Sequence, residues 1–250
     1  MADQPRQLYY SNPDNITGAR VSRDMMVTLC SAFGEALDDP DTRHFIRNTR
    51  IPNERELYGT FIKALLSDGF NSQIGHIATE VQVSRQTDEA SGKGRVDIIF
   101  DYRSTSFLVE LKVIRASVNG RQPGEEYATT TQRLVRPWQK AVNQLIELDE
   151  TSLGKALKKK VIKLPIALYL HVDNRQKGNT DQWEALSAAT HERIVSQLNT
   201  DVNNDDPARH HFSYFQPLTD PVTTSRRRGC LVEGTPDVRL YGFSIIAACQ

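Results

Sequence analysis

Two acidic residues and one lysine stand at spacings that would let them act together. Asp97 lies in one short, mainly apolar run, and Glu110 and Lys112 lie in the next such run. Side chains alternate along a β-strand, so Glu110 and Lys112 would share one face. If Asp101 pairs with Ser106 across the connecting turn, Asp97 lies directly opposite Glu110, with the two Cβ atoms about 5 Å apart.

Two carboxylates at this separation repel each other unless a cation or a shared proton offsets their charge. Hard oxygen ligands suit Mg²⁺ or Mn²⁺, which keep several waters and can bridge to a substrate phosphate. Such an ion could polarise a phosphoryl oxygen and lower the pKa of a bound water, while Lys112 holds that water or offsets charge in the transition state. The pattern therefore indicates phosphodiester hydrolysis.

An ordinary surface hairpin is the alternative interpretation of these three residues, since a solvated ion network needs no function and adds little stability. The neighbours of each charged position are apolar, among them Val96, Ile98, Val109 and Leu111. Such neighbours favour buried strands, where a charge needs a functional reason.

The same segment resembles the core of the PD-(D/E)XK nuclease superfamily. Asp97 matches the first acid of the family motif, and Glu110-Leu111-Lys112 matches its E-x-K. Val96 stands where the proline of the family name would be. The resemblance extends over residues 53–172.

The helix expected over residues 53–66 resembles the leading helix of that family, whose acidic residue faces the site. Its opening is similar to the nuclease part of type I restriction subunits. Glu54 fits this acid because Leu57 and Tyr58 follow it on the apolar stripe, which leaves Glu56 for the helix cap.

The resemblance implies a nuclease that requires one or two Mg²⁺ (or Mn²⁺) ions. The implied metal ligands are Glu54, Asp97, Glu110 and the carbonyl of Leu111. Lys112 would position the attacking water, and Gln144 would be the site-facing glutamine of the family. An equal alternative is that Gln144 lies on the solvent-facing side of an amphipathic helix and has no role in the site.

Local charge agrees with a phosphate-binding surface, although the whole chain carries 31 basic and 31 acidic residues. Residues 85–140 hold ten Lys or Arg and seven Asp or Glu. Contacts to the nucleic-acid backbone are expected there, and they would be independent of base sequence and sensitive to salt. The expected substrate-binding residues are Lys93, Arg95, Arg115, Arg121 and Lys140.

The elements that must position these residues follow from periodicity and from turn residues. Helices are expected over residues 22–37, 53–66 and 181–198, and a further helix is expected to begin at Pro137. Strands are expected over residues 77–86, 95–101, 106–114, 161–172 and 238–248, the first three as an antiparallel meander. No helix or strand is expected over residues 200–224. Together with the resemblance, this predicts an α/β fold whose restriction-endonuclease-like core is a central mixed β-sheet flanked by helices.

We expect an N-terminal helical extension over residues 1–50, a nuclease-like core over 51–175, and a helix and strand over 176–250 that complete the same domain. Without an apolar leader or a membrane-spanning run, an intracellular protein is expected. The expected partner is nucleic acid, DNA in the first instance, with no membrane. A homodimer or a partner protein stays open, as do an RNA-directed nuclease and a non-catalytic nucleic-acid-binding or assembly module.

Overall fold

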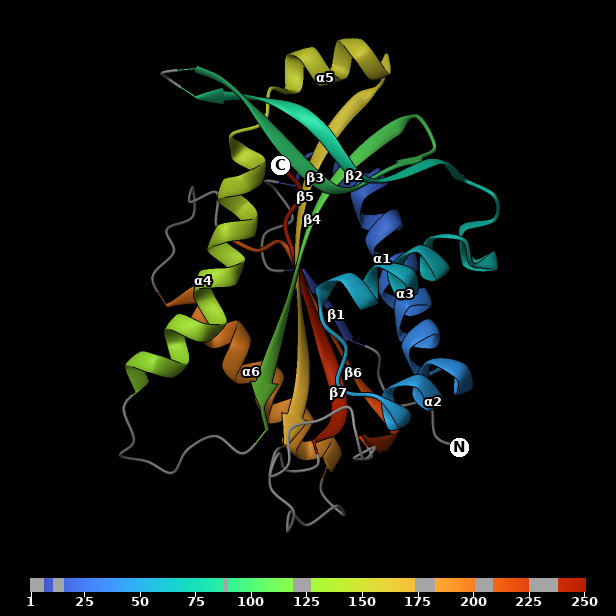
Figure 1. The fold of residues 1–250 in the computed structure, drawn as a ribbon, viewed down its shortest axis with the longest axis vertical. Helices are drawn as coiled ribbons and strands as arrows, with labels where there is room; N and C mark the ends of the chain where they lie inside the picture. Colours follow the sequence, from blue (N-terminus) through green and yellow to red (C-terminus); the bar gives the residue numbers. More distant parts are fainter. Residues whose placement is uncertain are drawn as a thin grey trace.

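A seven-stranded mixed β-sheet runs through the middle of the molecule in the computed structural model (Figure 1). The structure describes residues 7–10, 16–87, 90–118, 127–173, 183–200, 209–224 and 238–250. The strands are β1 (Gln7–Tyr10), β2 (Ile74–Thr87), β3 (Ala90–Tyr102), β4 (Thr105–Ser117), β5 (Lys160–Asp173), β6 (Phe212–Thr223) and β7 (Arg239–Ala247). Their order is β1-β6-β7-β5-β4-β3-β2, and β4 and β5 form the parallel pair in this otherwise antiparallel sheet.

Helices cover both faces of the sheet, which confirms the predicted α/β class (Figure 1). They are α1 (Ala19–Asp38), α2 (Pro40–Asn48), α3 (Glu54–Leu65), the single-turn η2 (Asp68–Phe70), α4 (Tyr127–Ile146), α5 (Glu150–Leu157) and α6 (Trp183–Asn199). The first three lie on one side of the sheet, and α4 and α6 lie on the other. None of the helices in the described ranges is long and apolar enough to cross a membrane.

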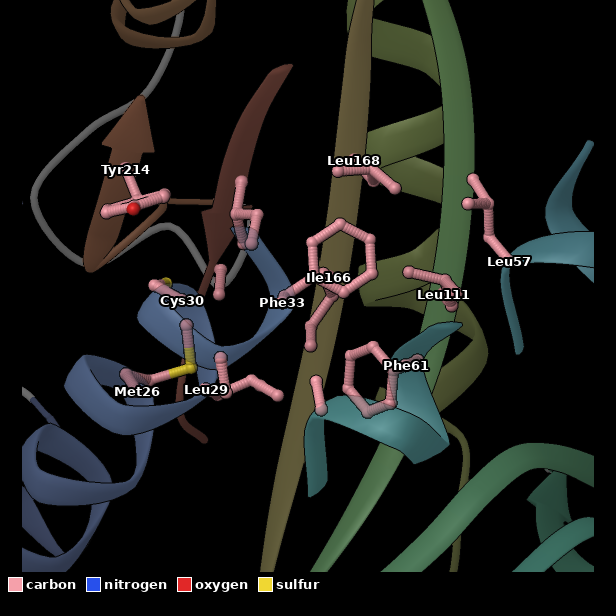
Figure 2. Close-up of a cluster of buried hydrophobic side chains, with 14 of the residues drawn as sticks. Met26, Leu29, Cys30, Phe33, Leu57, Phe61, Leu111, Ile166, Leu168 and Tyr214 are labelled. Carbon is pink, nitrogen blue, oxygen red and sulfur yellow. The ribbon is translucent and has the colours of Figure 1, made fainter. Parts of the chain in front are cut away.

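The larger hydrophobic core lies between the sheet and helices α1 and α3 (Figure 2). Leu29 and Phe33 of α1 and Phe61 of α3 pack toward Ile166 of β5, and Leu57 of α3 lies near Leu111 of β4. Helix α1, which lies in the region expected as an N-terminal extension, is therefore part of this core. The burial of α3 against β4 fixes the position of the acidic residues at the N-terminus of α3.

Strands β3 and β4 pair over only part of their length. The predicted pair Asp101↔Ser106 is present, and the ladder runs from Tyr102↔Thr105 to Ile98↔Val109. Beyond that point β3 continues to pair with β2, and β4 continues to pair with β5. The two strands therefore separate at the positions of Asp97 and Glu110, which opens a space between neighbouring strands of one sheet.

One predicted element needs correction: helix α4 begins at Tyr127, so Pro137 lies inside it instead of at its first turn. Residues 212–223 lie in the segment for which no element is expected, and they form β6. Strand β1 and helix α5 are further elements that are not among those expected. Helix α2 directly after α1 is an addition, and it begins at Pro40 with Asp39 as its N-cap.

A network of buried histidines joins β5, α6 and β7 on the side of the sheet away from α1. His171 Nδ1 lies 2.6 Å from Ser187 Oγ, and His171 Nε2 lies 2.9 Å from Ser244 Oγ. His191 Nδ1 lies 2.9 Å from the same Ser244 oxygen. Burial lowers the pKa of His171 and lowers the pKa of His191 to about 4.

This network should make the protein sensitive to acid. Below pH 6.5 the unfolded chain binds protons that His191 does not bind in the folded state, so the free energy of unfolding falls as the pH falls. For His191 alone we expect a loss of about 2 kcal/mol between pH 7 and pH 5. Urea unfolding at the two pH values measures it, and His191→Gln should show a correspondingly smaller difference. An equal pH dependence in the variant and the natural chain would contradict this assignment.

Candidate active site

The two strand carboxylates lie at the point where β3 and β4 separate. The backbone N–H of Leu111 donates to Asp97 Oδ2 at 2.9 Å, a contact that takes the place of the missing ladder. Only 6% of the Asp97 side chain and 2% of the Glu110 side chain are exposed. Asp97 and Glu110 therefore both lie where the strands separate, but they are not a paired position of the ladder, and the sheet backbone holds the Asp97 carboxylate.

The ammonium of Lys112 lies among three carboxylates. Its Nζ is 2.6 Å from Glu110 Oε1, 3.7 Å from Glu54 Oε1 and 3.9 Å from Asp97 Oδ2. The Lys112 side chain is 14% exposed and also donates a longer bond to the Leu111 carbonyl at 3.4 Å. The three acids come from α3, β3 and β4, so the fold gathers residues that are up to 56 positions apart in the chain (54 to 110).

A capping box fixes the N-terminus of α3, where Glu54 lies. Asn53 Oδ1 accepts from the Glu56 backbone N–H at 3.1 Å, and Glu56 Oε2 accepts from the Asn53 backbone N–H at 2.8 Å. Glu56 also pairs with Arg50 at 2.9 Å, which holds its carboxylate outside the cluster. Glu54 is therefore the acid that reaches Lys112, and Glu56 is the capping partner, as the helical spacing predicts.

Removal of this cap should affect both stability and the site. Asn53→Ala leaves backbone donors at the start of α3 without their side-chain acceptor, which should lower the free energy of unfolding by about 1 kcal/mol. Because Glu54 is the first residue of α3, the affinity for the Mn²⁺ that the resemblance implies should also fall. Chemical denaturation and a Mn²⁺ titration measure the two effects. Asn53→Asp keeps an acceptor, so both the free energy of unfolding and the Mn²⁺ affinity should stay near those of the natural chain. If Asn53→Asp loses as much stability and affinity as Asn53→Ala, the cap does not have this role.

The cluster lines a cavity of about 450 Å³. Its lining residues are Glu54, Arg95, Asp97, Glu110, Lys112, Lys140 and Gln144. The Gln144 amide oxygen is inaccessible to solvent and has no hydrogen-bond partner within the part of the chain that the structure describes. Lys140 and Arg95 are exposed on either side, on α4 and on β3. Helix α4 therefore presents Lys140 and Gln144 to the cavity and not only to solvent.

Burial and charge shift the pKa values of the two innermost groups. Burial raises the pKa of Glu110, and the nearby Asp97 carboxylate raises it further, while the hydrogen bond from Lys112 opposes both effects. For Lys112, burial lowers the pKa, but the contact with Glu110 and the charges of Glu54 and Asp97 outweigh burial, so its pKa is raised. Lys112 is therefore a cation at neutral pH.

Tyr58 is a neighbour of the site that the sequence argument did not assign to it. Burial raises the pKa of its hydroxyl, and so do the Asp97 charge and a hydrogen bond to Asp97. The phenol therefore stays protonated and donates to the Asp97 carboxylate. Its position on α3, four residues after Glu54, places it one turn away on the same helix face, a spacing that could have identified it.

The other expected substrate contacts have different outcomes. Arg115 is not among the residues that line the cavity, and its guanidinium donates to the Ile51 carbonyl at 2.8 Å. Arg95 lines the cavity and pairs with Glu80 at 3.5 Å. Lys93 lies in β3, where the structure gives its backbone, and Arg121 lies outside the described residues.

The donor chemistry of the cluster suits a hard cation. In the described ranges, no three His, Cys, Asp or Glu side chains are arranged to hold a metal ion directly. The three carboxylates are instead arranged around the Lys112 ammonium. Carboxylate and carbonyl oxygens are the ligands that Mg²⁺ and Mn²⁺ prefer, so Glu54, Asp97, Glu110 and the Leu111 carbonyl fit such an ion by type.

No protein-family model, curated protein or solved structure matches the chain. The class established by the structure is an α/β protein with a mixed sheet flanked by helices. The resemblance to PD-(D/E)XK nucleases therefore stays a prediction that depends on the residues of the site.

Proposed function

We propose that the protein is a metal-dependent nuclease that hydrolyses phosphodiester bonds of DNA in the cavity between β3, β4, α3 and α4. The observation that carries the proposal is the meeting of three carboxylates at one lysine, with Asp97 and Glu110 almost fully buried. Buried charges are costly, and a hydrophobic replacement is often as stable. A cluster of this kind in a cavity is therefore better explained by function than by stability.

Glu54, Asp97, Glu110 and the Leu111 carbonyl would hold Mg²⁺ or Mn²⁺. When bound, the ion would act as a Lewis acid on a phosphoryl oxygen and would favour ionisation of a coordinated water. The protein contributes rigidity, because the backbone of Leu111 fixes the Asp97 carboxylate.

Lys112 would orient the attacking water and offset the negative charge that develops on the phosphoryl oxygens. In the reaction, a bond forms between the water oxygen and phosphorus, and the bond to one bridging oxygen breaks. The water loses one proton and the leaving oxygen gains one, so the overall change is the addition of water. Gln144, whose amide oxygen lacks a partner in the described residues, would accept a hydrogen bond from that water or from the substrate.

Arg95 and Lys140 would contact phosphates on either side of the scissile bond. Both line the cavity, and they come from different elements, β3 and α4. Contacts of this kind give affinity that is independent of base sequence and falls with salt.

The proposal is tested by incubation of the purified protein with linear, circular, single-stranded and branched DNA, and with RNA, in Mg²⁺ or Mn²⁺. Cleavage that requires the divalent ion and stops when it is chelated supports the proposal, and the preferred polymer identifies the substrate. Binding of DNA without cleavage of any substrate would favour a non-catalytic binding or assembly module instead.

A further inference from the structure

The Lys112 ammonium already occupies the position of a cation among the site carboxylates. It lies within 3.9 Å of an oxygen from each of Glu54, Asp97 and Glu110, and it is closest to Glu110 at 2.6 Å. One lysine therefore satisfies, with a single positive charge, a group of three acids. The proposed function assigns the carboxylate oxygens of these same acids to a divalent ion.

The Asp97 carboxylate and the backbone of Glu110 have contacts that do not involve this lysine. Asp97 Oδ2 accepts from the Leu111 backbone N–H at 2.9 Å. Glu110 lies within the parallel pairing of β4 with β5, opposite Pro165. If the amine moves away, these contacts still hold the Asp97 carboxylate and the Glu110 backbone, and the repulsion between the two carboxylates is then unopposed.

A second polar group in the cavity can receive a displaced amine. The Gln144 amide oxygen is solvent-inaccessible and has no partner within the described part of the chain, and Gln144 lines the same cavity as Lys112. The four-carbon stem of a lysine is flexible and its ammonium carries three donors. This Gln144 oxygen is the acceptor proposed for the displaced Lys112 amine, which would leave the carboxylates open.

We propose that the Lys112 ammonium is an internal competitor of the metal: it neutralises Glu54, Asp97 and Glu110 in the metal-free protein and must leave Glu110 before a divalent ion can bind. This inference rests on the proposed function, since it concerns the same carboxylates. A double charge attracts the acids more strongly than a single charge at the same distance, so the ion displaces the amine once its concentration is high enough. The affinity for the metal is correspondingly lower than the three acids alone would give.

The experiment compares Mn²⁺ affinity in the natural chain, Lys112→Met and Lys112→Gln by calorimetric titration. Both variants lack the competing charge and should bind Mn²⁺ about tenfold or more tightly than the natural chain. Lys140→Met is the matched control: it removes one positive charge from the same cavity but leaves the Lys112 contacts in place. Its affinity for Mn²⁺ should change much less, by about threefold at most.

Thermal unfolding provides a second readout that does not depend on cleavage. Without metal, the Lys112 variants should melt at a lower temperature, because three neighbouring carboxylates have lost their cation. Added Mn²⁺ should raise their melting temperature by more than it raises that of the natural chain, since a tighter ligand stabilises more at a given concentration. A melting transition that shifts upward with Mn²⁺ also shows that the variants fold.

The outcomes separate the competition from the nuclease proposal. If the natural chain binds Mn²⁺ and both Lys112 variants bind it equally or more weakly, the competition is wrong and the metal site stands. If Lys112→Met and Lys140→Met gain affinity equally, the effect comes from overall cavity charge, and the direct competition is wrong. If none of the proteins binds Mn²⁺, both the competition and the metal-dependent nuclease are rejected. If neither Lys112 variant folds, with or without Mn²⁺, the competition is rejected.

Discussion

Lys112→Met should reduce the rate of metal-dependent DNA cleavage by about 10²- to 10³-fold, even when Mn²⁺ is saturating. The loss is expected because the ammonium would no longer orient water or offset charge at the phosphorus. The cavity stays the same in its other walls, and methionine keeps much of the length of the side chain. Single-turnover cleavage at saturating metal measures the chemical step apart from metal binding.

Lys63→Met is a suitable control for this prediction. Lys63 belongs to α3 as Glu54 does, but its ammonium pairs with Asp39 at 3.0 Å and it does not line the cavity. Its replacement should leave cleavage unchanged. Full activity of Lys112→Met under the same conditions would mean that Lys112 has no part in the chemistry.

Asp97→Asn should show the second large effect, a decrease of about 10²-fold or more in cleavage together with weaker binding of Mn²⁺. Asparagine keeps a side-chain oxygen that can accept from the Leu111 backbone N–H, so the contact between β3 and β4 is retained. The substitution therefore removes the charge and one acceptor oxygen but keeps the contact to Leu111. Cleavage rates over a range of Mn²⁺ concentrations separate the loss of affinity from the loss of rate.

The matched control is Asp101→Asn, four residues further along β3. Asp101 accepts from Ser106 at 2.6 Å and pairs with Lys159 at 2.6 Å, outside the cavity. The Lys159 and Ser106 contacts lower the pKa of Asp101 despite its partial burial, so its replacement affects stability and not cleavage. Similar losses of cleavage in the two variants would indicate a general effect on β3 instead of a role for Asp97.

The register of the β3–β4 hairpin could be predicted from the sequence because it depends on local rules. The turn, the alternation of side chains and the pair Asp101↔Ser106 are enough to bring Asp97 and Glu110 to the same end of the hairpin, although the ladder stops one pair short of them, at Ile98↔Val109. The choice of Glu54 over Glu56 follows in the same way from the capping box and the apolar stripe of α3.

Features that depend on tertiary context could not be predicted in this way. Pro137 suggests the first turn of a helix, but α4 continues through it, and its apolar face, which includes Trp138, packs on the sheet. The prolines of β6, such as Pro217, argue against a strand in the sequence, yet this segment pairs with β7. Arg115 has the charge expected of a phosphate contact, yet it does not line the cavity, and one of its guanidinium N–H groups donates to the Ile51 carbonyl.

A crystal structure of the protein grown with Mn²⁺ would show whether this cavity is a metal site, because anomalous scattering locates the ion independently of activity. We expect an anomalous peak in the cavity, coordinated by the carboxylates of Asp97 and Glu110, with the Lys112 ammonium moved away from Glu110. Crystals that hold Mn²⁺ elsewhere, or that keep the Lys112 contact to Glu110 intact at saturating Mn²⁺ with no peak in the cavity, would contradict it.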